Sequence, residues 1–140
     1  MRRLLLDATT LASGIAGLAY RGPSARLVEE LLVGTFEAVL CPTLIDELRR
    51  ALGKPYFARR ISAGQVSAAL EDLTAISVLC TDPTDPPRVL RDPNDNYLLA
   101  LAASAGAQAI VTGDKDLLEH PGLHPPAITA RQALEQLRVS

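Results

Sequence analysis

The chain has 140 residues, of which 48% are hydrophobic, 21% charged and 4% aromatic, and its formal net charge is −2. This balance is typical of a single globular domain over residues 1–140, and it excludes a strongly basic field around the whole molecule. No apolar run reaches the roughly 18–20 residues of a membrane helix, and Asp7 interrupts the N-terminal run too early for a signal peptide. We therefore expect a cytoplasmic protein without membrane association, in which Cys41 and Cys80 are reduced.

The predicted elements alternate between strands and helices along the whole chain. In order, we expect a strand at 2–8, a helix at 22–34, a strand at 36–41, helices at 42–53 and 62–75, a strand at 76–80, a proline-rich loop at 81–93, a helix at 92–106, a strand at 107–113, a loop at 120–126, a strand at 127–129 and a helix at 130–138. The strands are continuous apolar runs, as burial on both faces requires. This pattern predicts an α/β fold with a mostly parallel sheet that helices cover on both faces.

Carboxylates follow the carboxyl ends of two predicted strands. Asp7 comes after the first strand, and Asp114 and Asp116 come after the fourth. Like charges repel, and their burial is costly unless a cation or solvent compensates. Ligands of open parallel sheets bind at this edge, where the strand order reverses direction. If the first and fourth strands are neighbours, Asp7 and Asp114 face each other across the crevice.

Two predicted helices each contain a pair of acids whose members have different roles. Helix periodicity places Asp46 opposite the apolar face of its helix, whereas Glu47 lies at the edge of that face and can lean toward a cleft. Asp92 before a proline is typical of an N-cap. Asp95 is either a partner in that cap or a site residue, and the acids at the strand ends favour the second interpretation.

Four segments in this order resemble the PIN-domain ribonucleases: LLLDATTLASG, PTLIDELRRAL, DPNDNYLLALA and IVTGDKDLL. The resemblance extends through essentially the whole chain, and the last two segments are its most specific part. Within that family, the segments are most similar to the branch of toxins from type II toxin–antitoxin systems (VapC-like). The resemblance implies a three-layer α/β/α fold with about five parallel strands and an acidic cluster that binds a divalent metal ion.

The resemblance also implies roles for individual acids. The catalytic set of the family falls on Asp7, Glu47, Asp95 and Asp114. The implied metal ligands are Asp7, Asp95 and Asp114, together with Asp116 as an auxiliary ligand. From the residues alone, Asp116 either completes the acidic cluster or caps the helix that follows it. Carboxylate oxygens suit Mg²⁺ or Mn²⁺, so we expect one of these ions as the cofactor.

Two hydroxyl residues are expected to support the acids. Thr112 matches the small hydroxyl residue that precedes the acid in the family. The first motif departs from the usual D-x-N pattern, because here it is Asp7-Ala8-Thr9. Thr9 keeps a hydroxyl that can hydrogen-bond a neighbouring carboxylate, so we expect it to support the site.

The expected function is that of a metal-dependent endoribonuclease that hydrolyses RNA phosphodiester bonds and is the toxin of a toxin–antitoxin pair. The alternative is a catalytically weakened RNA- or protein-binding module on the same fold, with the site weakened through Ala8 and Thr9. The four retained acids favour the enzyme. The resemblance implies RNA, a cognate antitoxin and a second copy of the chain as partners, with helices 22–34 and 42–53 as the candidate surface of a homodimer.

A basic stretch follows the second predicted helix and contains no acid. Its cations are Arg49, Arg50, Lys54, Arg59 and Arg60. Phosphate contacts, with base stacking on the two interleaved aromatic residues, would explain this composition as an RNA-binding surface. A solvated face with the aromatic rings tucked into a helix junction explains it equally well, and antitoxin docking is a third interpretation.

Overall fold

The computed structural model describes residues 2–18 and 21–139. Within this part of the chain, five parallel strands form one sheet in the order β3-β2-β1-β4-β5. The strands are β1 (Arg3–Leu6), β2 (Glu37–Leu40), β3 (Val78–Leu79), β4 (Ala109–Val111) and β5 (Ala127–Ile128). The predicted α/β fold with a mostly parallel sheet of about five strands is therefore confirmed.

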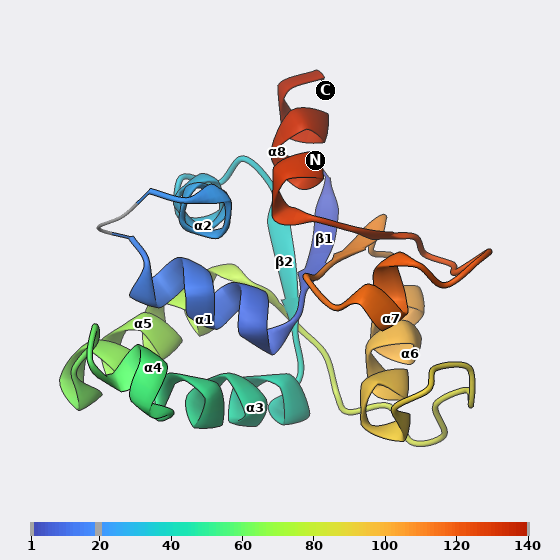
Figure 1. The fold of residues 1–140 in the computed structure, drawn as a ribbon, viewed down its shortest axis with the longest axis horizontal. Coiled ribbons are helices and arrows are strands. Elements are labelled where there is room, and N and C mark those ends of the chain that lie inside the picture. Colours follow the sequence, from blue (N-terminus) through green and yellow to red (C-terminus); the bar gives the residue numbers. More distant parts are fainter. Residues whose placement is uncertain (1, 19–20, 140) are drawn as a thin grey trace.

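Helices lie on both sides of the sheet and give the molecule three layers. The helices are α1 (Ala8–Ala16), α2 (Pro23–Leu32), α3 (Pro42–Leu52), α4 (Pro55–Ala58), α5 (Ala63–Ile76), the 3₁₀ turn η1 (Pro93–Asp95), α6 (Asn96–Ala105), α7 (Lys115–Leu118) and α8 (Ala130–Val139). Helices α6 and α7 lie on one side of the central strands, and α1, α3, α4 and α5 lie on the other (Figure 1). The chain therefore encloses its sheet between two helical layers, as the apolar strand sequences require.

The centre of the sheet is formed by β1 and β4, whose side chains are almost completely buried. Leu5 lies beside Ile110 and Leu6 beside Val111 in the parallel register, and these four side chains are at most 1% exposed. The first and fourth strands are thus neighbours, as expected. Asp7 extends the pairing by one residue, because its N–H donates to the carbonyl oxygen of Val111 at 3.1 Å.

Helix α1 was not predicted, and the expected strand at 2–8 ends earlier, at Leu6. Asp7 is the N-cap of this helix, and its carboxylate accepts the N–H of Thr10. Thr9 and Thr10 in the first turn of the helix have low helix propensity, but tertiary packing overrides it. Gly14 lies so close to α2 that an added Cβ would collide with the Val28 side chain and with the carbonyl oxygen of Ser24.

Other boundaries also differ from the predictions. The short helix α4 was not predicted, since four residues are too few to show an apolar period, and the helix expected after Asp116 is α7, which begins one residue before Asp116, at Lys115. Helix α5 continues to Ile76, so β3 is shorter than the expected strand at 76–80. The expected helix at 92–106 begins as η1, in which the Asp92 side chain accepts the N–H of Asn94 at 3.0 Å. The predicted N-cap role of Asp92 is confirmed.

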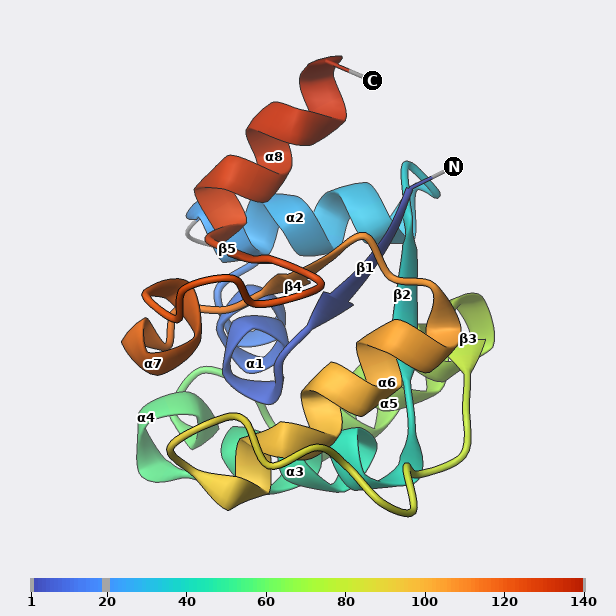
Figure 2. The same ribbon diagram turned by 90° about the vertical axis from the view of Figure 1, so that its right-hand side faces the viewer.

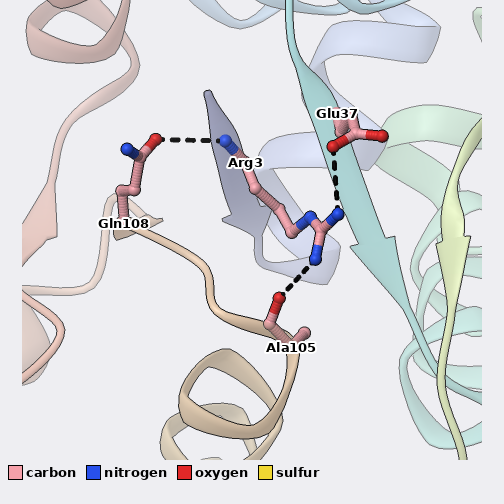
Figure 3. Close-up of polar contacts among 4 residues, drawn as sticks. All are labelled: Arg3, Glu37, Ala105 and Gln108. Atoms are coloured by element: carbon pink, nitrogen blue, oxygen red, sulfur yellow. Dashed lines mark hydrogen bonds and ion pairs between the residues drawn. The ribbon is translucent and has the colours of Figure 1, made fainter. Parts of the chain in front are cut away.

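Arg3 joins three elements at the amino ends of the strands (Figure 3). Its Nη1 atom donates to the carbonyl oxygen of Ala105, the last residue of α6, at 2.7 Å, and its Nη2 atom donates to Oε1 of Glu37 in β2 at 3.1 Å. Its backbone N–H donates to Oε1 of Gln108, which precedes β4, at 3.1 Å. A cation at a helix C-terminus is electrostatically favourable, so this end of the sheet serves stability.

The opposite end of the sheet is where α1, α3 and η1 begin. Figure 2 shows the strands running from the end that carries α8 toward the end that carries α3. Because all strands are parallel, their carboxyl ends meet at this edge, and the residues that follow β1, β2 and β4 are gathered there. Any site built from the predicted acids must therefore lie at this edge.

Candidate active site

A pocket of about 350 Å³ opens at the carboxyl edge of the sheet. Its lining residues are Asp7, Ala8, Thr9, Glu47, Asp95, Leu98, Gly113, Asp114 and Leu117. All four acids of the predicted catalytic set are among them, although they come from four separate segments of the sequence. Asp116, the fourth predicted metal ligand, is exposed to solvent and does not line this pocket.

Both oxygens of the Asp7 carboxylate accept hydrogen bonds. Oδ1 accepts the N–H of Thr10 at 2.9 Å, and Oδ2 accepts the hydroxyl of Thr112 at 2.5 Å. The same Thr112 hydroxyl accepts the N–H of Asp114 at 3.0 Å. One buried threonine therefore links the acid after β1 to the acid after β4. The hydroxyl that orients Asp7 is that of Thr112, whereas Thr9 lies exposed on the pocket wall.

Asp114 is held by the short helix that it opens. It is the N-cap of α7, and its Oδ1 atom accepts the N–H of Asp116 at 2.9 Å. The suggestion that Asp116 caps this helix is therefore wrong, because Asp114 does so. Its second oxygen, Oδ2, remains available to the pocket.

Glu47 and Asp46 point in different directions, as helix geometry predicts. Glu47 is half-buried and lines the pocket, and its Oε2 atom accepts the hydroxyl of Tyr97 at 2.8 Å. The Asp46 side chain is 61% exposed and lies 3.3 Å from Nη2 of Arg50, one turn farther along α3. Asp46 is thus a solvated charge, whereas Glu47 belongs to the pocket.

The carboxyl group of Asp95 has a raised pKa. Its pKa is raised from the ordinary value of 3.8 to about 6, mainly by burial and, to a smaller extent, by the charges of Asp92, Asp114, Glu47 and Asp7 in that order. Although Asp95 is the N-cap residue of α6, its side chain makes no capping hydrogen bond. The carboxylate is thus free of the structural role that its position in the helix suggested.

The donor set fits a divalent cation. Within residues 2–18 and 21–139, no three histidine, cysteine, aspartate or glutamate side chains already form an arrangement that could hold a metal ion. Mg²⁺, however, keeps several of its waters and is usually bound by one or two carboxylates together with substrate phosphates, so it needs no closed protein cage. Four carboxylates around an open pocket, one of them resisting ionisation, match that requirement. A cation would relieve the repulsion that raises the pKa of Asp95.

The two cysteines take no part in the pocket. Both are free thiols, and Cys41 is buried at the end of β2. Burial raises the pKa of Cys41 to about 11, so the thiol stays protonated and is a poor nucleophile. Carboxylates are thus the ionised groups available to the chemistry of the pocket.

The loop between β3 and η1 is fastened to the two helices that carry Glu47 and Asp95. Oδ1 of Asp82 accepts the N–H of Thr43 at 2.9 Å in the first turn of α3. At the other end of the loop, Oδ1 of Asn96 in α6 accepts the N–H groups of Val89 and Leu90, at 3.2 and 2.8 Å. The loop therefore bridges α3 and α6 beside the pocket.

We expect Asn96→Ala to lower the free energy of unfolding by about 1–3 kcal/mol, because it leaves two backbone N–H groups without their acceptor next to a buried side chain. Asn96 is 4% exposed and Leu90 is 8% exposed, so water replaces the lost amide poorly. Urea denaturation measures this change. Asn94→Ala, at an exposed position in η1, is the control, and an equal loss in both variants would contradict the assignment.

The basic stretch begins in the last turn of α3, with Arg49 and Arg50, and continues through α4 to Arg60. Arg50 pairs with Asp46, and Nε of Arg59 donates to the carbonyl oxygen of Pro55 at 3.2 Å. Arg60 lies over the Tyr56 ring at 4.4 Å from its centroid. The Tyr56 ring is 58% exposed, whereas the neighbouring Phe57 packs into the core. The stretch thus presents guanidinium groups and one aromatic face to solvent.

Most of the chain matches a known protein family. The profile of a family described as "PIN domain" matches residues 3–116. The chain belongs to the PIN domain family. PIN domains are generally nucleases, which are hydrolases, and the family profile spans all four acids of the pocket. No curated protein sequence matches the chain.

A solved structure shares the PIN fold of this chain. The protein of the "Crystal structure of PAE2754 from Pyrobaculum aerophilum" is 20% identical, and the similarity covers 99% of this chain and 91% of that one with a TM-score of 0.63. This similarity supports the three-layer fold. Among residues 2–18 and 21–139, no helix combines the length and the apolar character that crossing a membrane requires.

The sequence did not indicate the roles of two residues beside the pocket. Tyr97 hydrogen-bonds Glu47 across the pocket edge, and Asn96 holds the adjacent loop. A phenol and an amide directly after Asp95 were visible in the sequence, but nothing in the sequence specified their partners. Both roles depend on segments that are distant along the chain.

Proposed function

We propose that this PIN domain is an endoribonuclease that hydrolyses RNA phosphodiester bonds and requires Mg²⁺ or Mn²⁺. The observation that carries the proposal is the convergence of four carboxylates on one open pocket, together with the raised pKa of Asp95. Membership of a family of nucleases supports the hydrolytic reaction. A carboxylate whose pKa is raised by burial and by neighbouring charges, as that of Asp95 is, destabilises the folded protein unless a bound ligand compensates its charge.

The residues of the pocket have separable tasks in this proposal. Asp7 and Asp114, fixed by Thr112, would hold the cation between β1 and β4, and Asp95 would complete the set from η1. A bound divalent cation would supply charge to stabilise the developing negative charge on the phosphate and would lower the pKa of a bound water. Glu47 lies on the α3 side of the pocket, where its carboxylate would help to hold the cation and could accept a proton from that water.

The basic stretch is the candidate surface for the rest of the RNA. An RNA strand that leaves the pocket over α3 would meet the cations that follow Glu47 in the last turn of α3 and around α4. These are Arg49, Arg50, Lys54, Arg59 and Arg60. Phosphate contacts would provide affinity without sequence specificity. The exposed Tyr56 ring offers a surface on which a base can stack.

We also propose that the protein is the toxin of a type II toxin–antitoxin pair. The order and spacing of the four acidic segments resemble that branch of PIN domains most closely. In this proposal the protein is cytoplasmic and forms a homodimer through the surface of α2 and α3. A cognate antitoxin covers the pocket until it is removed.

Purified protein should cleave a mixed RNA pool in the presence of Mn²⁺ and lose that activity when EDTA removes the ion. Single-stranded DNA of the same sequences serves as the comparison substrate, since an endoribonuclease should cleave the RNA selectively. Calorimetry with Mn²⁺ alone measures the metal site independently of cleavage. Metal binding without cleavage of any RNA would favour the alternative of a weakened binding module, and absence of both would refute the proposal.

A further inference from the structure

One side chain connects the two helical layers at the edge of the pocket. Tyr97 lies in the first turn of α6, and its hydroxyl donates to Oε2 of Glu47 in α3 at 2.8 Å. Helices α3 and α6 lie on opposite sides of the central strands (Figure 1). The hydrogen bond therefore spans the open carboxyl edge between the layer that carries Glu47 and the layer that carries Asp95.

The environment of Tyr97 allows little movement of its hydroxyl. The residue is 9% exposed, and its ring is part of the hydrophobic core. The side chain of its neighbour Asn96 accepts two backbone hydrogen bonds from the adjacent loop. These hydrogen bonds fix the start of α6. The phenol is thus a hydrogen-bond donor with a fixed position beside the acidic pocket. The Glu47 side chain has more rotatable bonds than Tyr97, so a fixed donor can restrict its conformation.

The hydroxyl of Tyr97 occupies one of the two carboxylate oxygens of Glu47. Asp7 is oriented by the N–H of Thr10 in its own cap and by the hydroxyl of Thr112 after β4, and Asp114 is oriented by the N–H of Asp116 in its own cap. The Glu47 carboxylate is oriented by Tyr97, which occupies Oε2 and leaves Oε1 for the pocket. Donors behind ligating carboxylates typically fix their orientation and tune their basicity.

We propose that Tyr97 is a positioning residue that restricts Glu47 to a single oxygen, Oε1, directed into the pocket, and thereby sets the affinity of the site for its divalent cation. This inference rests on the proposed function. It adds a residue that acts through Glu47 rather than on the cation or the RNA.

Tyr97→Phe tests the inference, because it removes the hydroxyl and keeps the ring in the core. Calorimetry with Mn²⁺ in the absence of RNA should show an affinity about 10- to 100-fold weaker than that of the wild type. Ser104→Ala is the matched control, since it removes one hydroxyl hydrogen bond from the exposed side of the same helix. The control should bind Mn²⁺ as the wild type does.

A double-mutant cycle separates positioning from packing. In a Glu47→Ala background, adding Tyr97→Phe should produce no further loss of Mn²⁺ affinity, because the group through which Tyr97 acts is absent. An equal loss in both backgrounds, or wild-type affinity in Tyr97→Phe itself, would overturn the inference and leave the proposed function standing. A wild-type protein that neither binds Mn²⁺ nor cleaves RNA would overturn both.

Discussion

Replacing Asp114 by asparagine should abolish RNA cleavage and leave a folded protein. The change removes one anionic oxygen ligand from a site that would hold its cation through few carboxylates. The fold should survive because asparagine is as good an N-cap as aspartate, so it can still accept the N–H of Asp116 that opens α7. Loss of one charge also relieves the repulsion on Asp95, to which Asp114 contributes.

Two measurements check this expectation. Cleavage of a mixed RNA pool should fall to background in Asp114→Asn, and thermal melting without metal should occur at the wild-type temperature or above it. Asp46→Asn is the matched control, since it neutralises an acid on the solvent face of α3, outside the pocket. Near wild-type cleavage by Asp114→Asn, or loss of cleavage in Asp46→Asn, would show that the acids have been assigned wrongly.

Asp95 should make the metal-free protein less stable as the pH rises. Its pKa in the fold is about 6, against an ordinary value of 3.8. Between these values the folded state binds more protons than the unfolded state, so the free energy of unfolding decreases with increasing pH. By pH 7 the cost should be on the order of 3 kcal/mol. Mn²⁺ should bind poorly below about pH 6, where protons compete for the same carboxylate.

Urea denaturation of metal-free protein between pH 4 and 7 follows this effect. Asp95→Asn should flatten the pH dependence, raise stability at pH 7 and weaken Mn²⁺ binding. Asp92→Asn, which neutralises the adjacent carboxylate but keeps a capping oxygen for Asn94, should retain most of the metal affinity. A pH profile of Asp95→Asn that matches the wild-type profile would contradict the raised pKa of Asp95.

The edge of the sheet could be predicted from sequence because it depends on local patterns. Apolar runs that end in an acid locate both the strands and the first residue beyond them, and this was enough to bring Asp7 and Asp114 to one edge. Helix periodicity separated Glu47 from Asp46 in the same way. The inference about Asp7 and Asp114 also needed the first and fourth strands to be neighbours, and the strand order β3-β2-β1-β4-β5 makes them so.

The remaining features depend on contacts that no local pattern encodes. Helix α1 has two β-branched residues in its first turn and contains Gly14, and it is stabilised by its close approach to α2. The pairing of Tyr97 with Glu47 joins residues fifty positions apart in two different layers. Such a hydrogen bond follows from the distance between α3 and α6, which the whole core determines.

The acids of the pocket also differ in whether the folded structure depends on them, and this difference has an evolutionary consequence. Asp7 caps α1 and receives Thr112, so selection for a folded chain alone would preserve it. Asp95 has no such structural role, and its charge works against folding. In a lineage that no longer needed catalysis, Asp95 would drift first and Asp7 last. The presence of Asp95 in a PIN domain of this kind is therefore a better indicator of a working enzyme than the presence of Asp7.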